Sequence, residues 1–443
     1  MLKEKSDRST KRLVLIELNE INFELASRYF ATHRLRNFQA LMAGPKVRTS
    51  SEASYEMLEP WIQWVSVHSG QTAAEHGVFR LGDIVGTRIP QIFEKVESEG
   101  YSVGCISPMN AENRLRSPAY FIPDPWTATS TDGSPWSRRI GAAISQAVND
   151  NSQGKITAGS ALGLLGGWLR FAKPSHYRRY VDLMRRSKGA PWRKALFLDL
   201  FIHDLHYALL RRRAPNFSTL FLNAGAHIQH HYLFNSKAQE GDCRNPAWYL
   251  HPQEDPVLEM LQVYDLILGE YMRMPGVSLL IATGLTQRPY DKITFYYRLK
   301  EHEAFLSRVG IAFEKVLPRM TRDFLVEFAT EAKCIEAERR MRSFKAGQDG
   351  IELFGEIDNR GRSLYVTLTY PHEIGPRFDV AYDGGEIDFG PLVAFVAVKN
   401  GMHDPDGFAF FHGGMAQFLP ADGAHVRCLY NSILNYFDIA VAN

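Results

Sequence analysis

The sequence has few cysteines, no long apolar run and almost no net charge. Its four cysteines, Cys105, Cys243, Cys334 and Cys428, are far apart and form no CxxC pair. Neither a zinc knuckle nor a disulfide framework is therefore predicted, and reduced thiols in a reducing compartment are the simpler interpretation. No stretch approaches the roughly 18 consecutive apolar residues that a membrane-spanning helix needs.

Signals for export and for nucleic-acid binding are also missing. The first ten residues, MLKEKSDRST, are charged, and the first apolar run, Leu13 to Leu18, is too short for a signal peptide and lacks a cleavage site. We therefore expect a cytoplasmic protein. The formal net charge is only +2 over 443 residues, so no nucleic-acid partner is expected.

What the sequence does have is an ordinary globular composition. Hydrophobic residues make up 45% and charged residues 23% of the chain, which is typical of a folded protein. Its length suits one large α/β domain with insertions, or two domains that share an interface.

Apolar strand patterns alternate with helical patterns along much of the chain. Continuous apolar runs, of the kind found in strands buried on both faces, occur at 13–18, 101–107, 217–222 and 277–283. Helical periodicity separates them, which predicts an α/β fold with a mostly parallel central sheet flanked by helices. We expect this core to comprise residues 11–130, 216–294 and 396–443.

A first departure from the alternation, 131–215, reads as a helical cap inserted between core strands. From Arg170 to Arg213 it holds twelve Lys or Arg residues against three aspartates. This basic cap could bind a phosphate or a sulfate, or it could contact an anionic lipid surface. Alternatively, it is a basic face exposed to solvent.

The second departure, 295–395, reads as an α+β insertion. We expect helices over 302–316 and 323–344, followed by short alternating strands over 350–358 and 362–370.

Polar residues follow the apolar strands at several places. The motifs that contain them are LIELNEIN, PWIQWVSVHSGQTAAEHG, FLNAGAHIQHHY, IATGLTQ and GMHDPDGFAFFHGG. Ligands of a parallel α/β sheet bind beyond the carboxyl ends of its strands, so these side chains are the first candidates for a site.

Taken in order, these motifs resemble the alkaline phosphatase-like superfamily, in particular its type I phosphodiesterase and nucleotide pyrophosphatase branch. In that superfamily a first strand ends in a metal-binding Asp, where this chain has Asn19. A later strand carries an Asp and, four residues on, a His; Asn223 and His227 keep this spacing.

The remaining motifs of the superfamily are matched less fully. Ser69-Gly70 and the following His76 stand at the nucleophile loop, and Thr283-Gly284 stands where an Asp-His-Gly step is usual. A glycine-rich loop brings the last metal His in the superfamily, and we expect His403, which glycines surround, to lie in such a loop. The resemblance implies hydrolysis or transfer of phosphate esters at two divalent cations roughly 4 Å apart.

The substitutions predict a smaller metal site. From the residues that remain at the superfamily's metal-ligand positions, we expect one divalent ion, zinc or manganese, with Asn19, Asn223, His227 and His403 as ligands. The set could be completed by one of four further residues: His230, His231, Glu17 or Glu20.

The superfamily's nucleophile position, ten residues before Gly70, is Pro60 in this chain. The adjacent Glu59 could act as a metal ligand, a general base or a carboxylate nucleophile, and Glu20 is the other candidate base.

Candidate substrate contacts are Trp61, Gln63 and Gln287. Trp61 and Trp64 could stack on a sugar or base, although aromatics beside an apolar helix are more often core.

The expected function is a metal-dependent hydrolase or transferase that acts on a phosphoester, phosphodiester or sulfoester. One alternative is a non-catalytic descendant of the fold that binds an anionic glycan or nucleotide. Another is a transferase or lyase of surface polysaccharide or lipid metabolism. In each case we expect the partner to be a small-molecule, glycan or lipid anion. The basic cap could also contact a membrane surface. The oligomeric state is not indicated.

Overall fold

The computed structural model describes residues 10–149, 157–319, 322–346 and 350–441. Most of the charged N-terminal segment, residues 1–9, lies outside this part. The chain divides into two compact units. Unit 1 comprises Met1–Glu240, Glu254–Arg288 and Gly401–Asn443, and unit 2 comprises Gly241–Gln253 and Pro289–Asn400.

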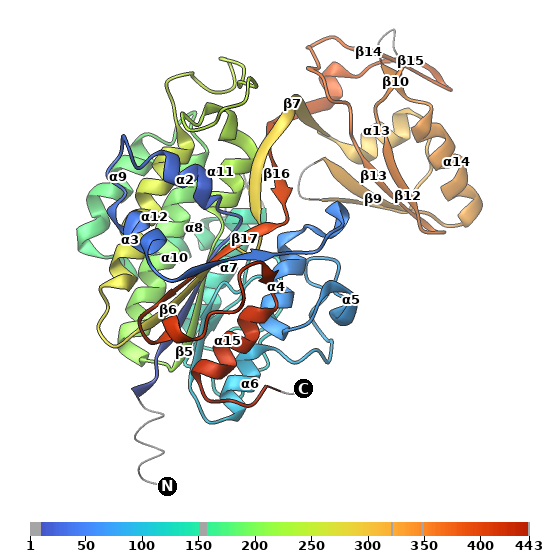
Figure 1. Cartoon of the computed structure of the whole chain (residues 1–443). Helices are drawn as coiled ribbons and strands as arrows, with labels where there is room; N and C mark the ends of the chain where they lie inside the picture. The colour runs from blue at the N-terminus through green and yellow to red at the C-terminus, as the bar shows by residue number, and fades with distance from the viewer. Residues whose placement is uncertain (1–9, 150–156, 320–321, 347–349, 442–443) are drawn as a thin grey trace. The chain divides into compact units, whose positions relative to one another are not determined.

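An eight-stranded sheet with the strand order β18-β2-β17-β6-β1-β5-β3-β4 forms the centre of unit 1 (Figure 1). Neighbouring strands from β6 to β4 are parallel, and β17 runs antiparallel to β6 and β2. This is the predicted α/β class, a mostly parallel central sheet flanked by helices. The strands are β1 (Leu13–Leu18), β2 (Lys46–Ser50), β3 (Val103–Ile106), β4 (Tyr120–Ile122), β5 (Phe217–Leu222), β6 (Ser278–Ala282), β17 (Asp406–His412) and β18 (Ala424–His425).

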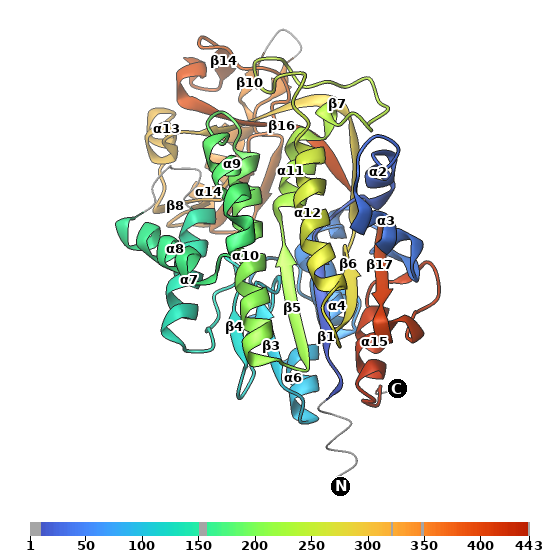
Figure 2. The ribbon, with the colours of Figure 1, turned by 90° about the vertical axis from the view of Figure 1, so that its left-hand side faces the viewer.

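Helices cover both faces of this sheet. Figures 1 and 2 show α10 and α12 on one face and α4, α6 and α15 on the other. The helices of the expected basic cap, α7 to α10, belong to unit 1, and α10 packs against β3 and β5. The helices are α2 (Phe23–Arg28), α3 (Arg36–Ala43), α4 (Pro60–Ser69), α5 (Ala73–His76), α6 (Ile92–Ser98), α7 (Pro135–Asn149), α8 (Ala158–Phe171), α9 (Tyr177–Arg185), α10 (Trp192–Arg213), α11 (Ala224–Tyr232), α12 (Pro256–Met272) and α15 (Cys428–Tyr436).

The central strands are apolar because helices exclude water from both of their faces. Every residue of β1, β5 and β6 is buried, as expected for parallel strands between two helical layers. The core on the α4 side includes Trp64, Val67, Phe93, Leu429 and Ile433. Among the described residues, no helix has both the length and the apolar character needed to cross a bilayer.

Unit 2 holds two four-stranded antiparallel sheets, with the orders β11-β10-β14-β15 and β12-β13-β9-β8. Two passages of the chain between the units lie in β7 (Thr286–Leu299) and β16 (Val393–Asp404), which pair with each other, and the other two flank Gly241–Gln253. The other elements are α13 (His302–Arg308), β8 (Lys315–Pro318), β9 (Asp323–Glu327), α14 (Glu331–Arg342), β10 (Lys345–Ala346), β11 (Ile351–Glu352), β12 (Glu356–Asn359), β13 (Ser363–Thr367), β14 (Asp379–Tyr382) and β15 (Gly385–Asp388).

The helix predicted over 323–344 is wrong in its first part. Residues Asp323–Glu327 form β9, in which Phe324 and Val326 are buried and their neighbours are half-exposed. This alternation has the period of a strand. The helix α14 begins only after Thr330, whose side chain accepts a hydrogen bond from the backbone N–H of Lys333.

Candidate functional site

The carboxyl ends of β1 and β5 bring Asn19 and Asn223 together. Nδ2 of Asn19 donates to Oδ1 of Asn223 at 2.8 Å. Oδ1 of Asn19 in turn accepts from the indole N–H of Trp64 at 2.8 Å. The side-chain carbonyl oxygens of Asn19 and Asn223, both predicted metal ligands, therefore accept hydrogen bonds within the protein.

Glu20, the next residue after Asn19, has an unusual backbone conformation. Its φ is 62°, in the left-handed region that residues other than glycine rarely adopt. Its N–H donates to the carbonyl oxygen of Thr283, beyond the end of β6, at 3.0 Å. The side chain is buried. Strained backbone of this kind clusters at functional sites.

The Glu20 carboxylate meets two imidazoles. Its Oε2 lies 3.1 Å from Nε2 of His230 and 3.3 Å from Nε2 of His403. Amide groups of Asn19 and Gln287 also donate to this carboxylate. We call Glu20, His230 and His403 the Glu20 cluster.

The surroundings of Glu20 favour its charged form. Burial alone would raise the pKa of the carboxyl group, but the imidazoles of His403 and His230 hold it well below its ordinary value. The cluster opens towards solvent on the side of His230, whose side chain is 33% exposed, against 12% for His403 and 2% for Glu20.

The donor set of the Glu20 cluster suits a divalent metal. One ligand atom from each of the three residues lies within 4.8 Å of the others. Two ligand atoms bound to one tetrahedral zinc lie about 3.3 Å apart, close to the 3.1 and 3.3 Å that separate the Glu20 oxygen from the imidazole nitrogens. Two histidines and one carboxylate leave a coordination position open, as catalytic zinc sites do.

Glu59 lies beside this cluster. It precedes α4 as the N-cap residue, and its Oε2 is 3.8 Å from Nδ1 of His403. This is beyond hydrogen-bond distance. Its side chain is 33% exposed, so Glu59 can reach both the cluster and solvent.

His227 lies one turn before His230 on α11, away from the three ligand atoms of the cluster. Its ring packs against the ring of His231, with centroids 4.8 Å apart. Burial, together with nearby His230, lowers the pKa of His227 to about 4. His227 is therefore neutral at physiological pH, and its role as a metal ligand stays a prediction.

Of the three predicted substrate contacts, Gln287 contacts the Glu20 cluster, whereas Trp61 and Gln63 make other contacts. Gln287 donates to Glu20 and to the carbonyl oxygen of Ala226. Trp61 packs against the core and donates its indole N–H to the carbonyl oxygen of Phe79. Gln63 is buried in α4 and donates to the carbonyl oxygen of Met57.

The segment that contains His403 is a strand and not the glycine-rich loop expected from its sequence. His403 is the penultimate residue of β16. Glycine is needed at position 401 for space and not for a turn. An added Cβ would lie 2.0 Å from Oε1 of Gln287 and 2.8 Å from the carbonyl oxygen of Gln229. Glycine lets β16 approach the Gln287 side chain and the backbone of α11 closely.

Helix α11, which carries His230, is anchored by Asp199 of α10. The Asp199 carboxylate accepts from the backbone N–H of Ala224 at 2.8 Å and from the hydroxyl of Tyr264 at 2.6 Å. Burial raises the pKa of Asp199 to about 6 despite these hydrogen bonds. No local sequence pattern could have shown this contact, because the partners lie 25 residues apart.

A second group with metal-ligand chemistry comprises His176, His203 and Glu270. Here the carboxylates already have cationic partners. Lys173 Nζ lies 2.5 Å from Glu270, and Nδ1 of His176 lies 2.7 Å from Asp204. Burial alone would lower the pKa of His176, but hydrogen bonds to Asp204 and Glu270 raise it to about 9. We interpret this group as an ion-pair network between helices.

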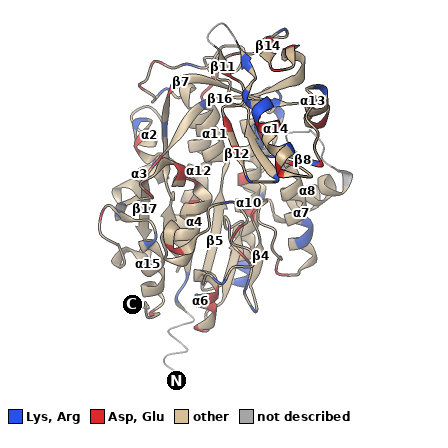
Figure 3. Ribbon diagram, turned by 90° about the vertical axis from the view of Figure 1, so that its right-hand side faces the viewer, with Lys and Arg blue, Asp and Glu red and all other residues tan. Residues whose placement is uncertain are grey.

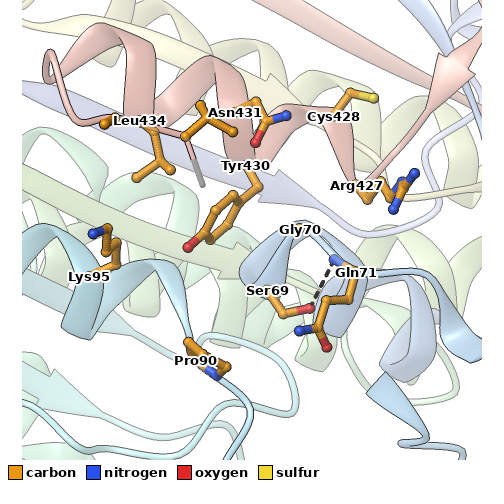
Figure 4. Close-up of a pocket in the computed structure, with 12 residues that line it drawn as sticks. Ser69, Gly70, Gln71, Pro90, Lys95, Arg427, Cys428, Tyr430, Asn431 and Leu434 are labelled. Atoms are coloured by element: carbon orange, nitrogen blue, oxygen red, sulfur yellow. Dashed lines mark hydrogen bonds between the residues drawn. The ribbon is translucent and has the colours of Figure 1, made fainter. Parts of the chain in front are cut away.

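A cavity of about 390 Å³ lies elsewhere in unit 1, between the end of α4 and α15 (Figure 4). Its lining includes Ser69, Lys95 and Tyr430 and no member of the Glu20 cluster. Ser69 donates to the carbonyl oxygen of Val65 and accepts from the N–H of Gln71. These hydrogen bonds hold its hydroxyl within the end of α4.

Fold and site together define a mixed α/β protein with a carboxylate and two imidazoles at the carboxyl edge of its sheet. No protein-family model and no curated protein sequence matches the chain. Solved structures do match it. Human ectonucleotide pyrophosphatase / phosphodiesterase 5 has 11% identity and a TM-score of 0.43, covering 98% of this chain and 96% of its own.

Two further matches are bacterial. Phosphonoacetate hydrolase from Sinorhizobium meliloti 1021 has 11% identity and a TM-score of 0.43, with 96% of each chain covered. Alkaline phosphatase from the Antarctic bacterium TAB5 has 9% identity and a TM-score of 0.39, covering 96% of this chain and 98% of its own.

Proposed function

We propose that this protein is a hydrolase or transferase that acts on a phosphate, phosphodiester or sulfate ester and uses one divalent metal ion, zinc or manganese. The observation that carries this proposal is the Glu20 cluster, in which a buried carboxylate and two imidazole nitrogens converge at the carboxyl edge of a parallel sheet. Such an edge is where α/β proteins bind ligands.

Each residue has a separate role in this proposal. Nε2 of His230, Nε2 of His403 and a Glu20 oxygen would hold the metal, which would polarise the ester oxygen as a Lewis acid. Gln287 and Asn19 fix the Glu20 carboxylate by hydrogen bonds. Glu59, which lies outside hydrogen-bond distance of His403, takes the proton from the attacking water or alcohol as general base.

The substrate we propose is a small-molecule, glycan or lipid anion. We also propose that the protein works in the cytoplasm. The cysteines that the structure describes form no disulfide, which supports a reducing compartment.

Metal analysis combined with turnover tests the proposal. Purified protein is expected to carry one zinc or manganese per chain and to cleave a nitrophenyl phosphate, a bis-nitrophenyl phosphate or a nitrophenyl sulfate. His403→Ala and Glu20→Gln should lose both metal and turnover. Glu59→Gln should keep the metal and lose turnover by about 100-fold or more, the usual contribution of a general base.

Two controls make the result specific. His33→Ala changes a histidine that is hydrogen-bonded to its neighbour Thr32, and His203→Gln changes the second ligand-like group; neither should alter metal content at the Glu20 cluster. Native protein that is free of metal and has no turnover would contradict the proposal. Anion binding that survives both chelation and His403→Ala would instead favour a non-catalytic binding protein.

A further inference from the structure

Helix α8 exposes three large apolar side chains. Leu162, Leu165 and Leu169 are 68%, 52% and 63% exposed. Their spacing places them on one face of the helix. Arg170 is the only charged residue of α8, and the helix is accordingly drawn almost entirely as uncharged in Figure 3.

The opposite face of α8 contains two glycines that pack closely, together with the buried Phe171. A Cβ added at Gly167 would lie 3.0 Å from Phe201 of α10 and 3.2 Å from Ile140 of α7. A Cβ added at Gly163 would lie 3.4 Å from Ala143 of α7. Soluble amphipathic helices bury their leucines, but three of the four leucines of α8 face out while its glycines pack inward.

Helix α9 extends this surface. Tyr177, Val181 and Met184, again on one helical face, are 37%, 54% and 54% exposed. The ring of Trp168 on α8 lies 5.1 Å from the ring of Tyr177, which brings the two helices together. Six of the fourteen large apolar residues exposed in the described part of the chain lie on these two helices. We call these six residues the apolar face.

Cations accompany the apolar face. From 158 to 190 the sequence has seven Lys or Arg residues, and Asp182 is the only acidic one. Arg170, Arg178, Arg185 and Lys188 are exposed. Apolar side chains with Lys and Arg beside them are typical of helices that lie in the interface of an anionic bilayer.

We infer that α8 and α9 dock on the surface of an anionic lipid bilayer, with the leucines of α8 among the upper acyl chains and the arginines at the headgroups. In Figure 2, α8 lies at the edge of unit 1, to the left of α10. Its 14 residues span about 21 Å, less than the roughly 30 Å hydrocarbon core, so the helix lies along the interface. This inference does not depend on the Glu20 cluster.

Vesicle sedimentation of the full chain tests the inference. The protein should sediment with vesicles of phosphatidylcholine and phosphatidylglycerol and much less with phosphatidylcholine alone. The triple variant Leu162→Glu, Leu165→Glu, Leu169→Glu should bind the anionic vesicles at least tenfold more weakly. Because all three side chains are exposed, the fold should persist, as circular dichroism can verify.

A matched control and a charge test complete the design. Ile335→Glu, which changes an apolar residue 62% exposed on α14, should leave binding unchanged. Arg178→Glu with Arg185→Glu should remove the preference for anionic vesicles. The inference is wrong if wild-type protein stays in the supernatant with both kinds of vesicle. It is also wrong if the wild type is a dimer that the triple leucine variant converts to a monomer without any vesicle binding, since the face would then join two copies of the chain.

Discussion

Glu20 combines a strained backbone with a buried carboxylate. A left-handed conformation costs a residue with a side chain roughly 1–2 kcal/mol, and burial of a carboxylate adds a desolvation penalty. These costs are offset by hydrogen bonds that the carboxylate accepts from Asn19 and Gln287 and by its attraction to the imidazoles of His230 and His403. The conformation directs the carboxylate at His230 and His403, which is the arrangement that a metal ligand requires.

Gly401→Ala should damage the candidate site without touching a predicted ligand. The new Cβ would lie 2.0 Å from Oε1 of Gln287, so Gln287 must leave its hydrogen bond to Glu20. Loss of a partner that orients a ligand lowers metal affinity by about 10- to 100-fold. Overpacking should also lower the free energy of unfolding by about 1–3 kcal/mol.

Isothermal titration with zinc and urea denaturation measure these two effects of Gly401→Ala. Gly159→Ala is the matched control, because an added Cβ there would meet nothing within 4 Å. Unchanged zinc affinity in Gly401→Ala would show that Gln287 does not orient Glu20.

At the scale of single elements, α11 depends on an acceptor supplied by another helix. Asp199 of α10 accepts the N–H of Ala224 in the first turn of α11. Asp199→Ala should cost about 1–3 kcal/mol of stability, because it leaves buried N–H and hydroxyl groups without an acceptor.

The same change should weaken zinc binding, since His230 lies on α11. Asp199→Asn, which keeps one oxygen acceptor, should restore most of the stability and the affinity. If Asp199→Ala lowers stability but leaves zinc affinity unchanged, the position of His230 does not depend on this anchor.

The sequence predicted elements well where a local pattern carries the information. The continuous apolar runs of β1, β5 and β6 were sufficient, because both faces of these strands are covered. The helix prediction failed over β9, whose five residues of alternating burial lie only three residues before α14. His403 was expected in a loop because glycines surround it, although Gly401 provides close approach within a strand.

The site was only partly predictable. Glu20 and His403 were candidates because each ends or follows an apolar strand, and His230 was an optional ligand beside His227. Which of these side chains converge depends on the direction of Glu20's backbone and on the rotation of α11. Both are set by contacts between residues far apart in sequence, such as Asp199 with Ala224.

His176 should make stability dependent on pH. It joins the segment before α9 to Asp204 of α10 and Glu270 of α12. Its pKa rises from 6.5 to about 9 on folding, so its stabilising effect is fully present below pH 6.5 and is lost as the pH rises through 9. A shift of this size corresponds to at most about 3 kcal/mol.

Urea denaturation of wild type and His176→Gln between pH 6 and pH 10 tests this expectation. The difference in free energy of unfolding between the two proteins should shrink as the pH rises. A constant difference between wild type and His176→Gln would indicate that His176 contributes packing and not charge.

At the scale of the whole molecule, the candidate site is confined to one unit. Glu20, Glu59, His230, Gln287 and His403 all belong to unit 1. Unit 2 has its own core, in which Phe324, Phe354 and Phe389 are completely buried. Separate cores predict that each unit unfolds as its own cooperative transition.

Phe354→Ala tests this autonomy. The cavity left in unit 2 should destabilise that unit by about 3–5 kcal/mol, so one of two calorimetric transitions should move to lower temperature. Zinc affinity and the other transition should stay unchanged, because no ligand of the Glu20 cluster lies in unit 2. Phe221→Ala, in the core of unit 1, should move the other transition and lower zinc affinity. A single transition that both variants shift equally would mean that β7 and β16 couple the two units into one cooperative fold, and the metal site would then depend on both cores.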